Sequence, residues 1–150
     1  MVRRMVVARV RPARATAQRK VLLVDDQPAF LDLARGLLQE CPNLVVVGQA
    51  TVGEQALTCA QTLRPDVALV DVLMPGISGF KLAQRLREQI PQLKVIVVSA
   101  VDDPLSPRLA RAAGAVGVLS TKALAAEAVV ALLEQQAGVR SKQAGGARRG

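Results

Sequence analysis

The chain has 150 residues, of which 51% are hydrophobic and 21% are charged, so it is long and apolar enough to bury the core of one domain. It contains no His, which excludes His-based catalytic triads and His-ligated metal sites. Its two cysteines are too few for a disulfide framework, and no apolar run is long enough to span a membrane. We therefore expect a soluble single domain in the cytoplasm.

The net charge of +8 is concentrated at the two ends of the chain. Residues 1–20 carry seven basic side chains and no acidic one, and residues 138–150 carry four basic side chains and no acidic one. The segment 21–137 has nine basic against twelve acidic side chains. We expect a mildly acidic folded domain over 21–137, flanked by two disordered basic segments. The first of these is interpreted as a solvated extension, with weak binding to nucleic acid or an anionic surface as the alternative.

Five short apolar runs recur along the middle segment and predict five β-strands. Most of them are continuously apolar rather than alternating, which is typical of parallel strands that are covered on both faces. The runs are Val21–Val24, Leu44–Val47, Val67–Val70, Val95–Val98 and Val116–Leu119.

Segments with helical periodicity alternate with these runs and predict five helices. The alternation predicts a (βα)5 fold, a doubly wound α/β sandwich of three layers around a parallel five-stranded sheet. The fourth helix, over 105–113, has the weakest pattern because Pro104 and Pro107 lie at its start. The faces of the other four are Leu31, Ala34, Leu38 and Cys41, then Ala56, Ala60 and Leu63, then Leu82, Leu86 and Ile90, and finally Ala125, Val129, Leu132 and Leu133.

Polar side chains follow four of the five runs, at the points where the predicted strands end. In an open parallel sheet these ends share one edge, where ligands bind. We therefore expect the polar side chains to converge on one rim of the sheet. They are Asp25 and Asp26 after the first run, Asp71 after the third, Ser99 after the fourth, and Ser120, Thr121 and Lys122 after the fifth.

Three carboxylates in one place repel one another, so without a cation one or more of them would keep its proton. An all-oxygen set without His or thiolate favours a hard ion such as Mg²⁺ over Zn²⁺. A carboxylate beside Mg²⁺ can also attack phosphorus and form an acyl phosphate, whose charge the ammonium of Lys122 would balance. The alternative is that acidic residues at strand ends only cap helices and turns.

The sequence lacks the Gly-rich phosphate loops of two large enzyme classes. No G-x-x-x-x-G-K-[ST] motif occurs, which excludes P-loop nucleotide hydrolysis. The loop that follows the first run, Asp25-Asp26-Gln27-Pro28, is not Gly-rich and argues against a dinucleotide site. Gly76 and Gly79 form only a G-x-x-G pattern and are interpreted as turn residues.

Four stretches of the sequence resemble the receiver domain of bacterial two-component response regulators. They are V-L-L-V-D-D (21–26), D-V-L-M-P-G-I-S-G (71–79), V-I-V-V-S-A (95–100) and A-G-A-V-G-V-L (113–119). The similarity covers 21–137, and the D-x-x-M-P-G-x-x-G stretch is its most specific part. The resemblance implies the flavodoxin-like strand order 2-1-3-4-5, which is the order known for a chemotaxis receiver.

The resemblance also implies roles for the acidic residues. Asp71 matches the phosphoacceptor, which takes a phosphoryl group from the phosphohistidine of a sensor histidine kinase or phosphotransfer protein. Asp25 and Asp26 match the acidic pair at Mg²⁺, with Asp26 ligating directly and Asp25 mostly through water. The backbone carbonyl of Leu73 matches the remaining protein ligand. Because the donor His belongs to another chain, the absence of His fits this role.

The switch residues match the family less completely. Ser99 matches the switch hydroxyl that moves toward the phosphoryl group, and Ala100 leaves the room which that group needs. Lys122 matches the Lys that pairs with the phosphoryl group, but it lies one residue further along than usual, so Thr121 is the alternative occupant of that place. Val118 stands where the family usually has an aromatic side chain.

Two apolar side chains lie where they would hinder hydrolysis of the acyl phosphate. Leu73 and Val101 come two places after Asp71 and Ser99 respectively. We interpret them as shielding the phosphoryl group from water, which predicts a long-lived phosphorylated state.

A short Gly- and Arg-containing segment follows residue 137, too short for the DNA-binding domain that follows many receivers of this type. We expect either a stand-alone receiver or the remnant of a truncated regulator, a phosphoacceptor signalling domain rather than an enzyme, without sequence-specific DNA binding. Predicted partners are the kinase or phosphotransfer protein, a downstream protein target and, as a further option, a second copy of the chain. The alternatives are a phosphorylation-independent scaffold and a weak nucleic-acid binder that acts through its basic ends.

Overall fold

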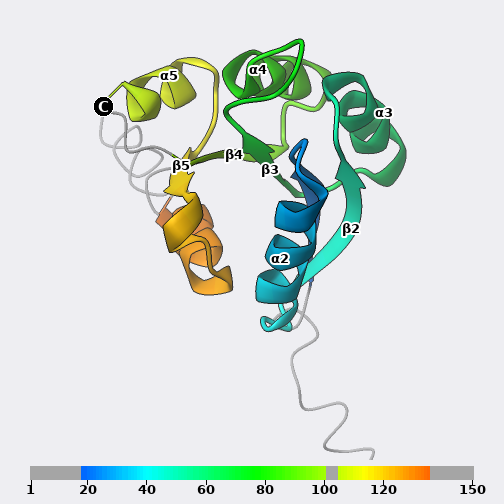
Figure 1. Ribbon diagram of the computed structural model, residues 1–150, viewed down its shortest axis with the longest axis vertical. Coiled ribbons are helices and arrows are strands. Elements are labelled where there is room, and N and C mark those ends of the chain that lie inside the picture. The colour runs from blue at the N-terminus through cyan, green and yellow to red at the C-terminus, as the bar shows by residue number, and fades with distance from the viewer. Residues whose placement is uncertain (1–17, 101–104, 136–150) are drawn as a thin grey trace, which may run out of the picture.

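The computed structural model describes residues 18–100 and 105–135, and strands and helices alternate along it as predicted (Figure 1). The strands are β1 (Arg19–Val24), β2 (Leu44–Ala50), β3 (Val67–Asp71), β4 (Lys94–Ser99) and β5 (Gly117–Ser120). The helices are α2 (Pro28–Gln39), α3 (Gly53–Leu63), α4 (Gly79–Gln89), α5 (Ser106–Ala112), the short 3-10 helix η1 (Thr121–Ala123) and a last helix over 126–135.

The five strands form one sheet in the order β2-β1-β3-β4-β5, and all four neighbouring pairs are parallel. This confirms the predicted flavodoxin-like topology. The register aligns Asp71 with Val98 and Ser99 with Ser120. The carboxyl ends of β3, β4 and β5 therefore lie together at one edge of the sheet.

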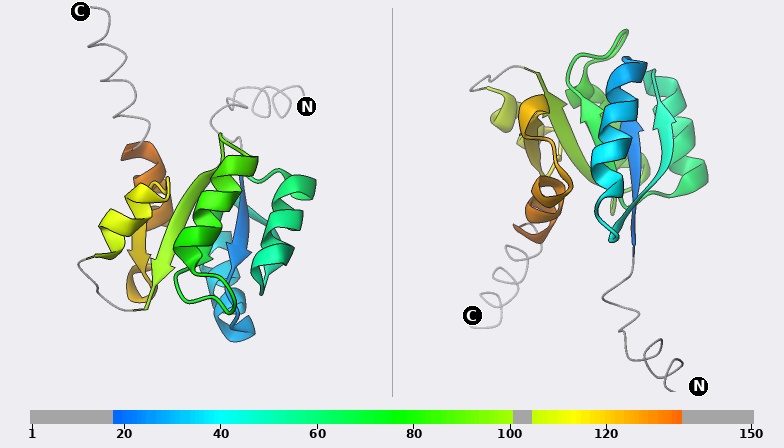
Figure 2. Two further views of the ribbon diagram at one scale, coloured as in Figure 1. Left: turned by 90° about the horizontal axis from the view of Figure 1, so that it is seen from above. Right: turned by 60° about the horizontal axis from the view of Figure 1, so that its bottom comes forward.

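Helices cover both faces of the sheet (Figures 1 and 2). Helices α3, α4 and α5 pack on one face with one set of strand residues, including Leu22 and Val24 of β1. Helix α2 and the last helix pack on the other face with the alternate residues, including Val21 and Leu23. Because successive side chains of a strand point to opposite faces, both sets must be apolar, which explains the continuous apolar runs.

Strand β1 begins at Arg19, so the predicted boundary of the N-terminal extension at residue 20 was two residues too late. Hydrogen bonds to residues that are distant in the sequence stabilise the first two residues of β1. The N–H of Arg19 donates to the carbonyl oxygen of Asn43 at 2.8 Å, and the N–H of Lys20 donates to a carboxylate oxygen of Asp66 at 2.7 Å. The rest of the two basic segments, residues 1–17 and 138–150, lies outside the described residues.

Helix α2 ends at Gln39, so Cys41 lies beyond the helix to which the periodicity assigned it. Pro42 follows and has no N–H with which to continue the helical hydrogen bonds. Helix α3 ends as predicted, with Arg64 in the left-handed conformation (φ 48°) immediately before Pro65. Among the described residues, no helix is both long and apolar enough to cross a membrane.

Candidate functional site

Three acidic side chains meet at the carboxyl edge of the sheet. Asp25 and Asp26 follow β1, and Asp71 ends β3, the strand beside it. Each offers a carboxylate oxygen, and these three oxygens all lie within 4.8 Å of one another. The predicted convergence of the three carboxylates is therefore confirmed.

The backbone around Asp25 fixes the direction of its side chain. Its own N–H donates to the carbonyl oxygen of Ala50 at 3.0 Å, which extends the pairing of β1 with β2 by one residue. The N–H of Gln27 donates to Oδ1 of Asp25 at 2.8 Å. Pro28 then begins α2 with its backbone already in a helical conformation. Asp25 is consequently buried and held in place, whereas Asp26 is half-buried.

Burial raises the pKa of Asp71 to about 6, and the negative charge of Asp25 acts in the same direction. Hydrogen bonds from the backbone N–H groups of Leu73 and Val72 oppose this rise but do not cancel it. Burial also raises the pKa of Asp25, against a hydrogen bond from Gln27 that lowers it. The site therefore favours protonated carboxyl groups until a positive charge compensates for the negative ones.

This donor set fits Mg²⁺. The ion prefers hard oxygen ligands and leaves room for phosphate oxygens. Three carboxylates within 4.8 Å of one another, with raised pKa values for Asp71 and Asp25, supply both the ligands and the unbalanced charge that such an ion would neutralise. The candidate ligands are the carboxylates of Asp25, Asp26 and Asp71, with the Leu73 carbonyl as the ligand implied by resemblance.

The raised pKa of Asp71 predicts a pH-dependent stability in the absence of divalent cations. In the unfolded chain the carboxyl titrates near its ordinary pKa of about 3.9, whereas the folded chain holds the proton up to about pH 6. Between these values the folded state binds more protons, so the free energy of unfolding falls as the pH rises. The loss is complete about one pH unit above the folded-state pKa of about 6, and it is on the order of 1 kcal/mol for a carboxyl that solvent partly reaches.

Urea denaturation at pH 4.5 and 7.5 checks this prediction, with Asp71→Asn as the control because Asn does not titrate. The wild-type chain should lose stability relative to the variant at the higher pH, and Mg²⁺ should restore it. An identical pH dependence in both proteins would contradict the assigned titration of Asp71.

The loop between β3 and α4 holds Asp71 through a close backbone contact at Gly79. The N–H of Gly79 donates to the carbonyl oxygen of Val72 at 2.8 Å. A Cβ atom at Gly79 would lie 2.0 Å from the carbonyl oxygen of Asp71, so only glycine fits. Sequence reasoning interpreted Gly79 as a turn residue and missed this contact. The turn interpretation suits Gly76, whose φ is +80°.

The switch residues lie at the ends of β4 and β5. Ser99 is buried at the end of β4, and Ala100 after it is exposed. Thr121 is half-buried, and its Oγ1 donates to the carbonyl oxygen of Ser99 at 3.3 Å. Lys122 is exposed on η1. Thr121 therefore contacts the backbone of Ser99 directly.

Leu73 and Val118 differ in their exposure to solvent. The Leu73 side chain is 72% exposed beside the acidic cluster. Val118 is half-buried in β5 and packs against the core cluster on the side of α4 and α5. Val101 lies outside the described residues.

Comparison with known proteins gives consistent matches. Residues 21–134 match the family model of the response regulator receiver domain. The chain is 41% identical over 122 residues to the response regulator GacA of Pseudomonas aeruginosa, a match that covers 81% of this chain and 56% of GacA. The chain thus spans about half the length of the curated GacA relatives that it matches.

Solved structures agree with the sequence matches. The signal receiver domain of NarL from Mycobacterium tuberculosis superposes with a TM-score of 0.69 at 32% identity, covering 75% of this chain and 94% of that one. The response regulator domain of Thermotoga maritima CheB gives a TM-score of 0.70 at 25% identity, covering 78% of this chain and 95% of that one.

Proposed function

The chain belongs to the response regulator receiver domain family, and from this membership we propose that it accepts a phosphoryl group on Asp71 from a partner histidine kinase. The observation that carries the proposal is the acidic cluster, in which three carboxylate oxygens from two neighbouring strand ends lie within 4.8 Å of one another. A phosphorylation-independent scaffold would have no need to hold three mutually repelling carboxylates together.

The proposed step is a phosphoryl transfer. An oxygen of the Asp71 carboxylate bonds to phosphorus as the bond between phosphorus and the donor imidazole nitrogen breaks, and that nitrogen keeps the electron pair. Asp25 and Asp26, with Asp71 and the Leu73 carbonyl, would hold Mg²⁺, which supplies positive charge to the phosphoryl oxygens and to the carboxylates. The backbone N–H groups of Leu73 and Val72 orient the Asp71 carboxylate.

The residues at the ends of β4 and β5 complete the site in this proposal. The hydroxyl of Ser99 donates to a phosphoryl oxygen, and Ala100 leaves space for the group. We assign the pairing cation to Lys122, which carries the only ammonium group between Gly117 and residue 135. Thr121 keeps the two strand ends together through its hydrogen bond to Ser99. Movement of Ser99 toward the phosphoryl group then changes the surface formed by α5 and β5.

The receiver domain family is a signalling family, so we propose that the chemistry of this chain is limited to gaining and losing the phosphoryl group. Its output is a phosphorylation-controlled contact with a downstream protein in the cytoplasm, or with a second copy of the chain. The basic ends would add at most weak, salt-dependent attraction to nucleic acid.

Phosphoramidate tests the proposal because it carries the same phosphorus–nitrogen bond as phosphohistidine. Incubation of the full chain with phosphoramidate and Mg²⁺, followed by phosphate-affinity electrophoresis, should produce one retarded band. Removal of Mg²⁺ with a chelator should suppress that band. A chain that stays unmodified under conditions in which the acidic cluster is folded and loaded with Mg²⁺ would overturn the proposal.

Leu73→Asn should shorten the lifetime of the phosphorylated state. The exposed Leu73 side chain lies beside Asp71 and offers no hydrogen bond to an attacking water, whereas an amide in its place would position one. We expect hydrolysis to become faster by about tenfold, roughly the gain from one well-placed hydrogen bond. Decay of the retarded band after removal of the donor measures the lifetime, with Leu73→Met as an apolar control. An unchanged or longer lifetime in Leu73→Asn would contradict the shielding role.

A further inference from the structure

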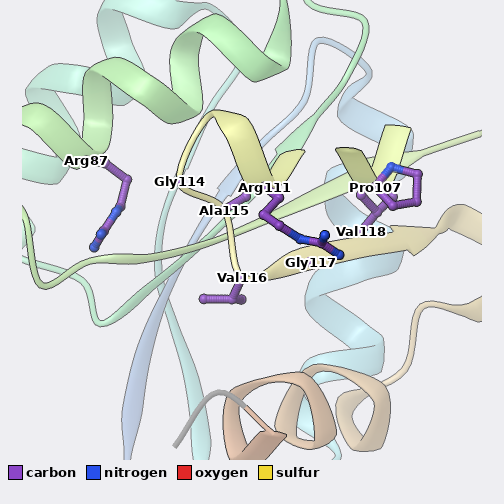
Figure 3. Close-up of a pocket in the computed structure, with 8 residues that line it drawn as sticks. All are labelled: Arg87, Pro107, Arg111, Gly114, Ala115, Val116, Gly117 and Val118. Carbon is purple, nitrogen blue, oxygen red and sulfur yellow. The ribbon is translucent and has the colours of Figure 1, made fainter. Parts of the chain in front are cut away.

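A pocket of about 400 Å³ lies between α4, α5 and β5 and includes none of the acidic cluster (Figure 3). It is formed by the last turn of α4, by α5 and by the segment that leads from α5 into β5. Within 18–100 and 105–135, none of the residues that line it is acidic. They are Arg87, Pro107, Arg111, Gly114, Ala115, Val116, Gly117 and Val118.

Hydrogen bonds hold one end of the Arg87 guanidinium in place, whereas another of its nitrogen atoms has no acceptor among the described residues. Its Nη1 donates to the carbonyl oxygens of Pro91 and Leu93, the second at 3.1 Å, so this end of the guanidinium stabilises the chain after α4. Its Nε is buried and, among the described residues, has no hydrogen-bond partner. A buried donor without an acceptor is costly. The hydrogen bonds that Nη1 makes at the end of α4 therefore do not account for the burial of Nε.

Arg111 supplies a second guanidinium from the opposite helix. It is exposed in the last turn of α5, and Figure 3 shows it and Arg87 on either side of the segment that contains Gly114 and Ala115. Gly114 has a φ of +87°, and a Cβ atom there would lie 3.4 Å from Nε of Arg87. The backbone at Gly114 therefore lies against Nε, and Arg87 borders the pocket with other atoms of its side chain. Among the described residues that line it, the pocket combines two positive charges with no carboxylate.

Small side chains leave the rest of the pocket open and apolar. Ala115, Gly117 and Val118 line it, and Val118 stands at the position where the resemblance implies an aromatic residue. A volume of about 400 Å³ falls within the range of small-molecule sites, roughly 300–1,000 Å³. The space and the charges together suit a ligand with one anionic group and one compact apolar group.

We propose that this pocket binds a small organic anion, namely a phosphate ester or carboxylate joined to a compact apolar group. Arg87 and Arg111 supply the positive charge that attracts the anionic end, and Ala115 and Val118 contact the apolar part. Because the ligand would touch both α5 and β5, its binding would bias the same surface that phosphorylation is proposed to change. The binding itself is independent of Asp71 and of the proposed phosphoryl transfer.

Nuclear magnetic resonance on the ¹⁵N-labelled full chain tests the proposal with three probes in the absence of Mg²⁺. Phenyl phosphate supplies both groups, inorganic phosphate the anion alone and phenol the ring alone. Phenyl phosphate should cause saturable shifts of the Arg87 Nε–H signal and of the amide signals of Gly114, Ala115 and Gly117. The two partial probes should bind more weakly by about tenfold or more, because each lacks one set of contacts.

Three variants separate this site from general attraction to a basic surface. Arg111→Gln should weaken binding of phenyl phosphate by about tenfold, the effect of losing one charge-assisted hydrogen bond, and Val118→Phe should abolish it by filling the pocket. Arg108→Gln is the matched control, because Arg108 is an exposed residue of the same helix that does not line the pocket. Equal losses in Arg108→Gln and Arg111→Gln, or no saturable shift at these signals up to about 10 mM probe, would overturn the proposal.

Discussion

The Asp71→Asn variant should take up no phosphoryl group from acetyl phosphate or phosphoramidate, although it should fold as well as the wild-type chain. The amide nitrogen and oxygen of Asn are poor nucleophiles toward phosphorus, and no other side chain takes the position of Asp71 at the end of β3. The variant also removes one of three mutually repelling carboxylates, so without Mg²⁺ it should be more stable than wild type at pH 7.5.

Phosphate-affinity electrophoresis and urea denaturation check the two halves of this prediction. Asp32→Asn is the matched control, because Asp32 is an exposed residue of α2 outside the acidic cluster. It should keep the wild-type rate of uptake. Asp26→Asn should take up the phosphoryl group at a rate between those of Asp71→Asn and Asp32→Asn, because it removes a proposed metal ligand but leaves the phosphoacceptor. Wild-type uptake in Asp71→Asn would show that the phosphoryl group is accepted elsewhere.

Gly79→Ala should cost about 3 kcal/mol of stability, near the upper end for an overpacked site, and should weaken Mg²⁺ binding as well. The new Cβ atom would lie 2.0 Å from the carbonyl oxygen of Asp71 and 2.7 Å from Cα of Val72, both of which are backbone atoms that cannot rotate away. The loop must therefore shift, and the Asp71 carboxylate shifts with it. Loss of stability and loss of the metal site should thus occur together.

Urea denaturation with and without Mg²⁺ measures both effects. Gly36→Ala is the matched control, because Gly36 is an exposed residue within α2 and a Cβ atom there meets nothing within 4 Å. That substitution should stabilise the chain by about 0.5–1 kcal/mol through its higher helix propensity. If Gly79→Ala instead unfolded at the wild-type urea concentration and kept its response to Mg²⁺, the close approach at Gly79 would not be what positions Asp71.

The strands and most helix ends could be predicted from local sequence because local physics determines them. Continuous apolar runs indicate strands that are covered on both faces, and Pro65 and Pro91 mark the ends of α3 and α4. The start of β1 could not be predicted in this way. It depends on Asp66, which lies 46 residues away and accepts the N–H of Lys20. Such a contact has no signature in the sequence near Lys20.

The same distinction applies to the site. The convergence of Asp25, Asp26 and Asp71 follows from the rule that parallel strand ends share an edge. The contact of Gly79 with the Asp71 backbone required coordinates, because the sequence alone equally suits a turn. The relative positions of Thr121 and Lys122 also required coordinates, because a shift of one residue after β5 changes which side chain contacts Ser99.

The most direct test of the central claim locates the phosphoryl group chemically. Sodium borohydride reduces an aspartyl phosphate to homoserine, which marks the modified residue permanently. The chain is incubated with acetyl phosphate and Mg²⁺, reduced and digested, and its peptides are sequenced by mass spectrometry. We predict homoserine at position 71 only, and none when Mg²⁺ is chelated. Homoserine at another aspartate, or at none with Mg²⁺ present, would contradict the assignment of Asp71 as the phosphoacceptor.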